Sequence, residues 1–237
     1  MKQENQIILK KRNIFVLIAI ALSTIVIWQL PFGYFILYPF TILGTWFHEM
    51  GHGLTALILG GSFVRLEIFE NGSGLAVHTV DVLFGDLGLA FVAAGGPIGP
   101  TLAGALFIII SRNHNLSRLT LLLLGAIIII SVIIWVRTIF GILFLPIVAM
   151  IIIILSLKAS DKAQVFIIQL LGIQAFASVY QSIGYLMSDG GEVNQSSYLS
   201  DTAVISQLLF FPHWFWAGII IIFSILLIYL SLRIAYK

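Results

Sequence analysis

The sequence predicts an all-α polytopic membrane protein with about 6–7 transmembrane helices and one short β-hairpin. Composition is the first observation behind this class: 60% of the 237 residues are hydrophobic and 9% are charged. Soluble domains carry about 25% charged residues. The second observation is a series of long apolar runs, and the third is one short stretch of alternating strand-forming residues. Together they favour a helical bundle in a bilayer over a large soluble core.

Each expected crossing is an apolar run about as long as the ~20 residues that a helix needs to span the hydrocarbon layer. The first run follows Lys10-Lys11-Arg12. It is longer than the apolar region of about 7–15 residues in a secretory signal, so we expect a retained membrane anchor. A single integral membrane domain, residues 1–237, is expected to contain spans at 13–38 and 41–60, a hairpin at 62–80, and spans at 87–110, 119–135, 139–157, 164–187 and 203–236.

The orientation is predicted from the basic residues close to span ends, which favour the cytoplasmic side. The N-terminus is expected in the cytoplasm because basic residues precede the first run: Lys2, Lys10, Lys11 and Arg12. Segment 41–60 would then run inward, and the stretch after Gly60-Gly61 would be cytoplasmic. That arrangement would leave the basic residues of two later loops outside: Arg112, Arg118, Lys158 and Lys162.

The predicted hairpin consists of "SFVRLEIF" and "LAVHTV", which are β-branched and aromatic, with "ENGSG" between them. An Asn-Gly pair between two such runs is a strong hairpin signal. The free edge of the hairpin can pair with an extended peptide, since unpaired backbone groups accept another strand. A mere connector between two spans is the alternative.

The residues that carry chemistry lie in "HEMGH", inside the span 41–60. An ionisable group at that depth costs roughly 2.5–3.5 kcal/mol on insertion scales, so His48, Glu49 and His52 need a reason to be there. Histidines four residues apart share one helix face and can bind one metal ion, and the adjacent glutamate can act as general base on water bound to it. Zn²⁺, one per chain, suits two imidazoles and a third protein ligand. With five His and five Glu in the chain, chance gives the pattern with a probability of roughly 0.002.

These segments resemble the site-2 protease family of intramembrane zinc metalloproteases, in its small branch. "HEMGH" in a span resembles the family's motif, "GGSFVRLEIFENGSG" resembles its glycine-led hairpin, and "AAGGPIGP" resembles its Gly-Pro segment in the next span. The resemblance implies hydrolysis of peptide bonds in or near transmembrane segments of other proteins, with Glu49 as general base. Its partners would be a membrane-protein substrate and the lipid bilayer.

The resemblance also implies a third zinc ligand, an aspartate from a later span. Asp189 lies in "SDGG", which resembles the Asp-Gly-Gly of larger branches, and Asp201 lies in "SDT", which resembles a segment of small-branch members. Asp201 is slightly preferred, because it begins an apolar stretch that can re-enter the membrane, whereas Asp189 would reach back from a flexible Gly-Gly stretch. Ser200 is placed to cap a helix that begins near Asp201.

Other functions remain as alternatives at this point. A non-proteolytic metal-binding membrane protein or transporter would carry several intramembrane polar groups or paired repeats, and neither is visible. An enzyme that cuts short peptides arriving from the membrane surface is a third option. No basic tract suggests nucleic acid, and the absence of cysteine excludes disulfides and thiolate ligands. The sequence does not predict substrate-binding residues.

Overall fold

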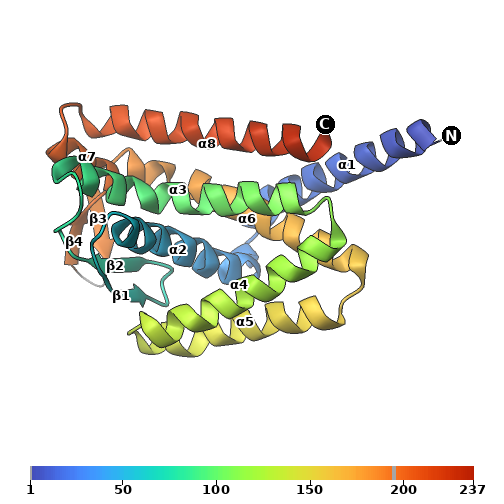
Figure 1. Ribbon diagram of the computed structural model, residues 1–237, viewed down its shortest axis with the longest axis horizontal. Coiled ribbons are helices and arrows are strands. Elements are labelled where there is room, and N and C mark those ends of the chain that lie inside the picture. Colours follow the sequence, from blue (N-terminus) through green and yellow to red (C-terminus); the bar gives the residue numbers. More distant parts are fainter. Residues whose placement is uncertain (1, 194–195) are drawn as a thin grey trace.

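The computed structural model describes residues 2–193 and 196–237, which form eight helices and two antiparallel two-stranded sheets (Figure 1). The helices are α1 (Lys2–Gln29), α2 (Gly33–Ile58), α3 (Asp86–Ile110), α4 (His114–Ile134), α5 (Ile139–Lys158), α6 (Asp161–Leu186), α7 (Asp201–Leu208) and α8 (His213–Tyr236). The strands are β1 (Phe63–Ile68), β2 (Gly74–His78), β3 (Gly190–Val193) and β4 (Ser196–Leu199).

Five helices of the described chain are long and apolar enough to cross a membrane, namely α3, α4, α5, α6 and α8. A sixth crossing results if α1 and α2 are taken as one span that is bent by 120°. The predicted class is therefore confirmed: the protein is an all-helical membrane protein with five or six crossings and a short hairpin after the helix that carries the HEMGH motif.

The bend between α1 and α2 corrects the predicted first span, 13–38. The helix ends at Gln29, and the next one begins at Gly33. The break contains Pro31. Proline lacks the backbone N–H that a helix interior requires, so it interrupts the helix. A Cβ on Gly33 would lie 1.6 Å from the carbonyl oxygen of Ile27, so the tight turn also depends on glycine.

This bend changes which end of the bundle carries the hairpin. Figure 1 shows both termini at one end and the two hairpins with α7 at the other. The sequence reasoning counted two crossings before the hairpin and therefore placed the hairpin on the same side as the N-terminus. In the structure α1 and α2 together lead from one end of the bundle to the other, so the first hairpin lies at the end opposite the N-terminus.

The predicted last span, 203–236, is also divided. The short helix α7 is followed by the connection 209–212 and then by α8. Pro212 is the N-cap residue of α8, a position next to the helix start where the missing N–H is not needed. The hydroxyl of Ser200 accepts a hydrogen bond from the amide of Ala203, as the expected cap of α7.

The first hairpin forms where the sequence predicts it. The Asn71-Gly72 turn joins β1 and β2, and Gly72 has a φ of +87°, which favours glycine. The outer edge of β1 is covered by the α4–α5 connection, since the amide of Leu66 donates to Trp135 O and its carbonyl accepts from Arg137 N. Among the described residues, β2 pairs only with β1.

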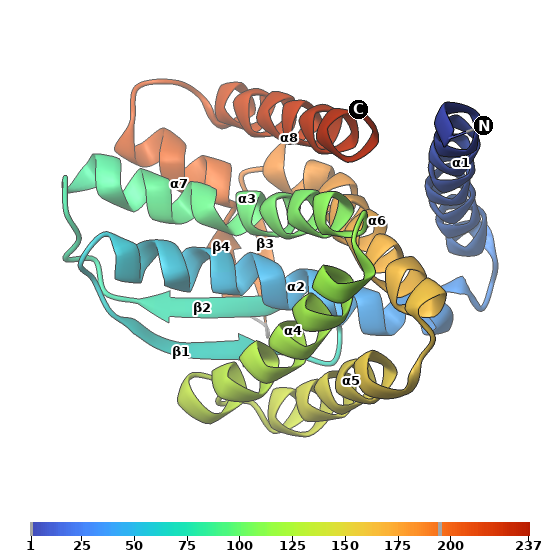
Figure 2. The same cartoon turned by 45° about the vertical axis from the view of Figure 1, so that its right-hand side comes forward.

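Helix α2 lies at the centre of the fold, between α3 and the first hairpin (Figure 2). Its apolar side packs into the main core, where Ile42, Trp46 and Met50 are buried. The indole N–H of Trp46 donates to the hydroxyl of Ser131 on α4 at 2.9 Å. The opposite side of α2 carries the motif, so the packing of the core holds the motif in a defined direction.

Candidate metal centre

His48 and His52 lie one turn apart on α2, with ring centroids 4.9 Å from each other. Nδ1 of His52 lies 2.8 Å from the carbonyl oxygen of Val92 on α3. A carbonyl can only accept, so this contact requires the tautomer with the proton on Nδ1. The lone pair of Nε2 is then free on the other side of the ring, as in a metal-binding histidine.

Asp201 reaches the two histidines from α7. Its Oδ2 lies 3.1 Å from Nε2 of His48, and its Oδ1 lies 3.2 Å from Nε2 of His52. The cap at Ser200 and a hydrogen bond from the Thr202 hydroxyl to Leu186 O fix the start of α7 against the end of α6. Two segments about 150 residues apart in the chain (149 from His52 and 153 from His48 to Asp201) therefore meet at this point.

The ligand atoms of His48, His52 and Asp201 fit a zinc ion. All three lie within 4.8 Å of one another. Ligands of a tetrahedral zinc, with bonds of 2.0–2.1 Å, are about 3.3–3.4 Å apart. Oδ2 of Asp201 is buried and, although it lies 3.1 Å from Nε2 of His48, it makes no hydrogen bond of acceptable geometry among the described residues. Burying a carboxylate oxygen without a hydrogen bond is costly. A cation bound between the three side chains would satisfy it.

Glycines keep the space around the histidines open. A Cβ on Gly96 of α3 would lie 2.1 Å from Nε2 of His52 and 2.8 Å from Nε2 of His48. Nearby, a Cβ on Gly51 would lie 2.2 Å from the carbonyl oxygen of Gly95. The "AAGGPIGP" segment thus lets α3 approach the motif face of α2 backbone to backbone, a contact that larger residues would prevent.

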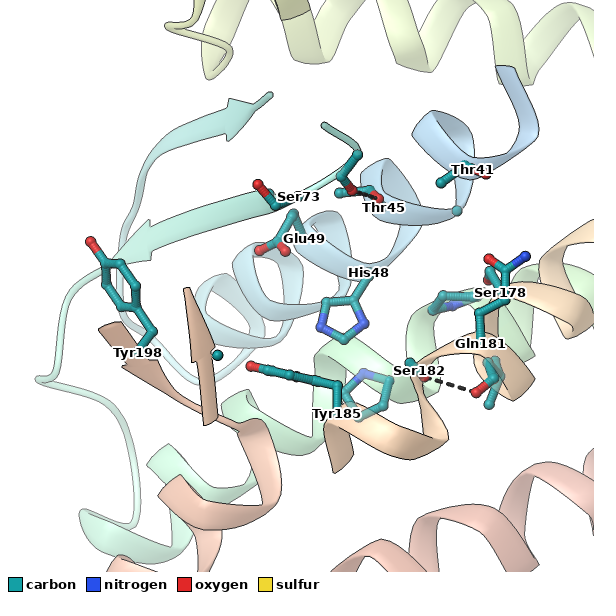
Figure 3. A pocket seen from close by; sticks show the side chains of 17 residues that line it. Thr41, Thr45, His48, Glu49, Ser73, Ser178, Gln181, Ser182, Tyr185 and Tyr198 are labelled. Carbon is teal, nitrogen blue, oxygen red and sulfur yellow. Dashed lines mark hydrogen bonds between the residues drawn. The ribbon is translucent and has the colours of Figure 1, made fainter. Parts of the chain in front are cut away.

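Glu49 and His48 line a cleft of about 310 Å³. Figure 3 shows both side chains pointing from α2 into it, with Tyr185 of α6 and Tyr198 of β4 on other walls. The turn of the first hairpin closes another side: a Cβ on Gly74 would lie 2.7 Å from Cγ of Glu49. The walls of the cleft are therefore formed by the motif glutamate together with residues of both hairpins.

Asp189, the alternative third ligand, lies elsewhere. Its Oδ1 is 3.2 Å from Nδ1 of His213 at the start of α8, and its side chain is 92% exposed. Nε2 of the same histidine lies 3.1 Å from the carbonyl oxygen of Met187. Asp189 thus belongs to a surface contact between the α6 end and α8, whereas the side chain of Asp201 is only 11% exposed.

Sequence reasoning missed several groups around the site. The carbonyl oxygen of Val92, which orients His52, has no side-chain signal in the sequence. Tyr185 lines the cleft together with three other polar residues of α6, namely Ser178, Gln181 and Ser182. Their spacing of three or four residues in an otherwise apolar span is a signal for a polar helix face, and it was available from the sequence.

The comparison with protein families agrees with this geometry. Residues 16–231 match the family described as Peptidase M50B-like. No curated protein and no solved structure matches the chain. Since the family match covers nearly the whole chain, and since it is the family that the motif, hairpin and Gly-Pro segment resemble, the protein belongs to the Peptidase M50B-like family, the site-2 protease family of membrane metallopeptidases.

Proposed function

We propose that this protein is an intramembrane zinc metalloprotease that hydrolyses peptide bonds in or near transmembrane segments of other proteins. In this proposal His48, His52 and Asp201 bind one zinc ion, and Glu49 is the general base. One observation carries it: three ligand atoms, one of them a buried carboxylate oxygen without a hydrogen bond, converge beside a cleft that the motif glutamate lines.

A bound zinc ion would act as a Lewis acid and activate water, which is the chemistry that peptide hydrolysis needs. The chain's own residues do the remaining work. Glu49 removes a proton from the attacking water and then delivers it to the leaving amine as the C–N bond breaks. The contact between His52 and Val92 O keeps the imidazole in one tautomer. Glu49, His52 and Asp201 are each only 8% exposed, so solvent weakens their electrostatic interactions less than it would at the surface.

Substrate positioning is proposed for the first hairpin. The outer edge of β1 is occupied by the α4–α5 connection, whereas β2 has no second strand partner among the described residues. Gly72, Ser73 and Gly74, which lead into β2, line the cleft beside Glu49. A substrate segment that unwinds to an extended conformation can pair with this edge and bring a backbone carbonyl to the site.

The test is turnover of a membrane-embedded substrate by Glu49→Gln, with bound zinc measured on the same preparation. The amide keeps the size of the side chain but cannot take up the proton, so activity should be lost while zinc is retained. Glu70→Gln is the matched control, because it makes the same chemical change at an exposed position in the hairpin turn. Substantial turnover by Glu49→Gln contradicts the general-base role. Zinc binding by a wild-type protein that cuts no peptide favours a non-proteolytic metal-binding protein or transporter.

A further inference from the structure

We propose that a groove between α2, α3 and α4 is a binding site for one acyl chain of a membrane phospholipid. This groove has a volume of about 580 Å³. It is separate from the cleft beside Glu49, because the two cavities share no lining residue. Binding of an acyl chain here does not depend on the proposed proteolytic activity.

The course of α4 creates the groove. This helix leaves α3 at the connection 111–113 and diverges from it, so that a space remains beside α2 (Figure 1). The residues of α4 that line the space are Thr120, Leu123, Leu124 and Ile127. Their spacing of three or four residues places them along one side of the helix. The groove therefore runs along α4 and is not a pit at one point of the surface.

The groove lies at the depth of the hydrocarbon layer. Both α3 and α4 are long and apolar enough to cross a membrane, and the groove residues 120–127 occupy the middle of α4 (His114–Ile134). The walls carry two hydroxyl side chains, Thr55 and Thr120, and no charged side chain in the part of the chain that the structure describes. The hydroxyl of Thr55 donates to Gly51 O within its own helix. At this depth, an apolar space is filled by lipid or by another transmembrane helix.

The dimensions of the groove fit a hydrocarbon chain and not a helix. Gly95 and Ile110 of α3 both line the groove, and the helix rises about 22 Å between them. A volume of about 580 Å³ over that length gives a mean cross-section of about 26 Å². A helix about 10 Å wide needs about 80 Å². Carbon atoms touch at about 3.5–4.0 Å, so a single hydrocarbon chain is about 4–5 Å wide and needs roughly 16–25 Å².

The rim of the groove also disfavours a second helix. Four branched side chains form much of it, and they are 48–51% exposed: Leu102, Leu106, Leu123 and Ile127. Transmembrane helices associate through small residues that let their backbones approach closely. Branched side chains at the rim keep another backbone away, whereas they can surround a thin and flexible chain.

The floor of the groove is the backbone contact that supports the candidate metal centre. Gly51 of α2 and Gly99 of α3 line the groove, and a Cβ on Gly99 would lie 2.5 Å from the carbonyl oxygen of Phe47. Within the same helix pair, Gly96 lies directly against both histidines of the metal centre. An acyl chain in the groove therefore packs against the two helices whose spacing determines the room for the metal.

The test is photolabelling of the full-length protein in detergent with increasing amounts of a phosphatidylcholine that carries a diazirine in the middle of one acyl chain. Mass spectrometry locates the adducts. Adducts at the groove residues of α4 should saturate at a low ratio of lipid to detergent. Met150 of α5 is the internal control, because it is 59% exposed and lines neither cavity, so its labelling should rise in proportion to the probe. Equal dependence at both places, or no adduct in the groove, overturns the proposal.

Two variants separate binding in the groove from general contact with lipid. Thr120→Trp fills the groove from the α4 side. Leu119→Trp is the matched control, because Leu119 is the preceding residue of the same helix, is 50% exposed and does not line the groove. With unchanged elution in size-exclusion chromatography, saturable labelling should disappear in Thr120→Trp and remain in Leu119→Trp. Saturable groove labelling in both variants contradicts the assignment.

A second copy of the chain is the competing occupant, and a single thiol tests for it. The natural chain has no cysteine, so Leu123→Cys places one thiol at the rim of the groove. We expect this variant to remain monomeric when it is oxidised in liposomes, because lipid fills the groove. Efficient formation of disulfide-linked dimers shows that another copy covers this face and overturns the proposal.

Discussion

Substituting Gly96 with alanine would put a methyl group between the two histidines of the candidate metal centre. The added Cβ would lie 2.1 Å from Nε2 of His52, 2.3 Å from its Cε1 and 2.8 Å from Nε2 of His48. These nitrogens are the atoms proposed to bind zinc. The substitution therefore fills the space between the histidine nitrogens without changing any of the residues proposed to bind zinc.

The size of the effect follows from the backbone around it. An ordinary contact begins at 3.4 Å, so the methyl carbon and Nε2 of His52 must separate by about 1.3 Å (3.4 minus 2.1 Å). The helices cannot separate locally without opening the Gly51–Gly95 backbone contact next to it. Overpacking of this kind costs about 1–3 kcal/mol in the free energy of unfolding. Displacing a ligand should weaken zinc binding by at least the roughly 10–100-fold seen when outer partners of a metal site are changed.

The assay is zinc content of the purified protein together with competition against a chelator of known affinity. Gly218→Ala is the matched control, because it makes the same change in α8 with no atom within 4 Å, and alanine there should stabilise the helix by roughly 0.5–1 kcal/mol. We expect Gly96→Ala to lose zinc and activity and Gly218→Ala to keep both. Wild-type zinc affinity in Gly96→Ala would refute the assignment of this space to the metal.

The remaining predictions concern the ligands and the hairpin. Asp201→Ala should lose zinc and activity, whereas Asp189→Ala should keep most of both. Metal analysis of the two variants distinguishes them. Loss of zinc only in Asp189→Ala would make Asp189, and not Asp201, the third ligand. His52→Ala should not hold zinc, because one imidazole and one carboxylate rarely suffice, and an unchanged stoichiometry would exclude the site. Thr138→Ala should destabilise the protein by about 1 kcal/mol, because the hydroxyl caps α5 and exchanges hydrogen bonds with the backbone of Ile68; equal melting temperatures would contradict this.

Much of the molecule follows from local sequence patterns. Apolar runs predict membrane helices because a helix satisfies its own backbone groups in lipid. Asn71-Gly72 predicts the hairpin, since glycine accepts the positive φ of the turn. His48 and His52 share a face because of helical periodicity alone. These features depend on residues within a few positions of one another, so the linear sequence contains the information that determines them.

Other features depend on segments that meet only in the folded chain. The two aspartates had similar claims in the sequence, and packing of α7 against the end of α6 brings Asp201 to the histidines while Asp189 faces His213. Counting apolar runs placed the hairpin on the side of the N-terminus, because the run 13–38 looked continuous. The structure interrupts this run around Pro31, and α1 and α2 meet there at a bend of 120°. The direction in which a chain leaves such a break is determined by what the following helix packs against, which for α2 is α3 and the hairpin. The sequence by itself therefore determined the class of protein and the motif, and the tertiary structure decided which aspartate reaches the motif and at which end of the bundle it lies.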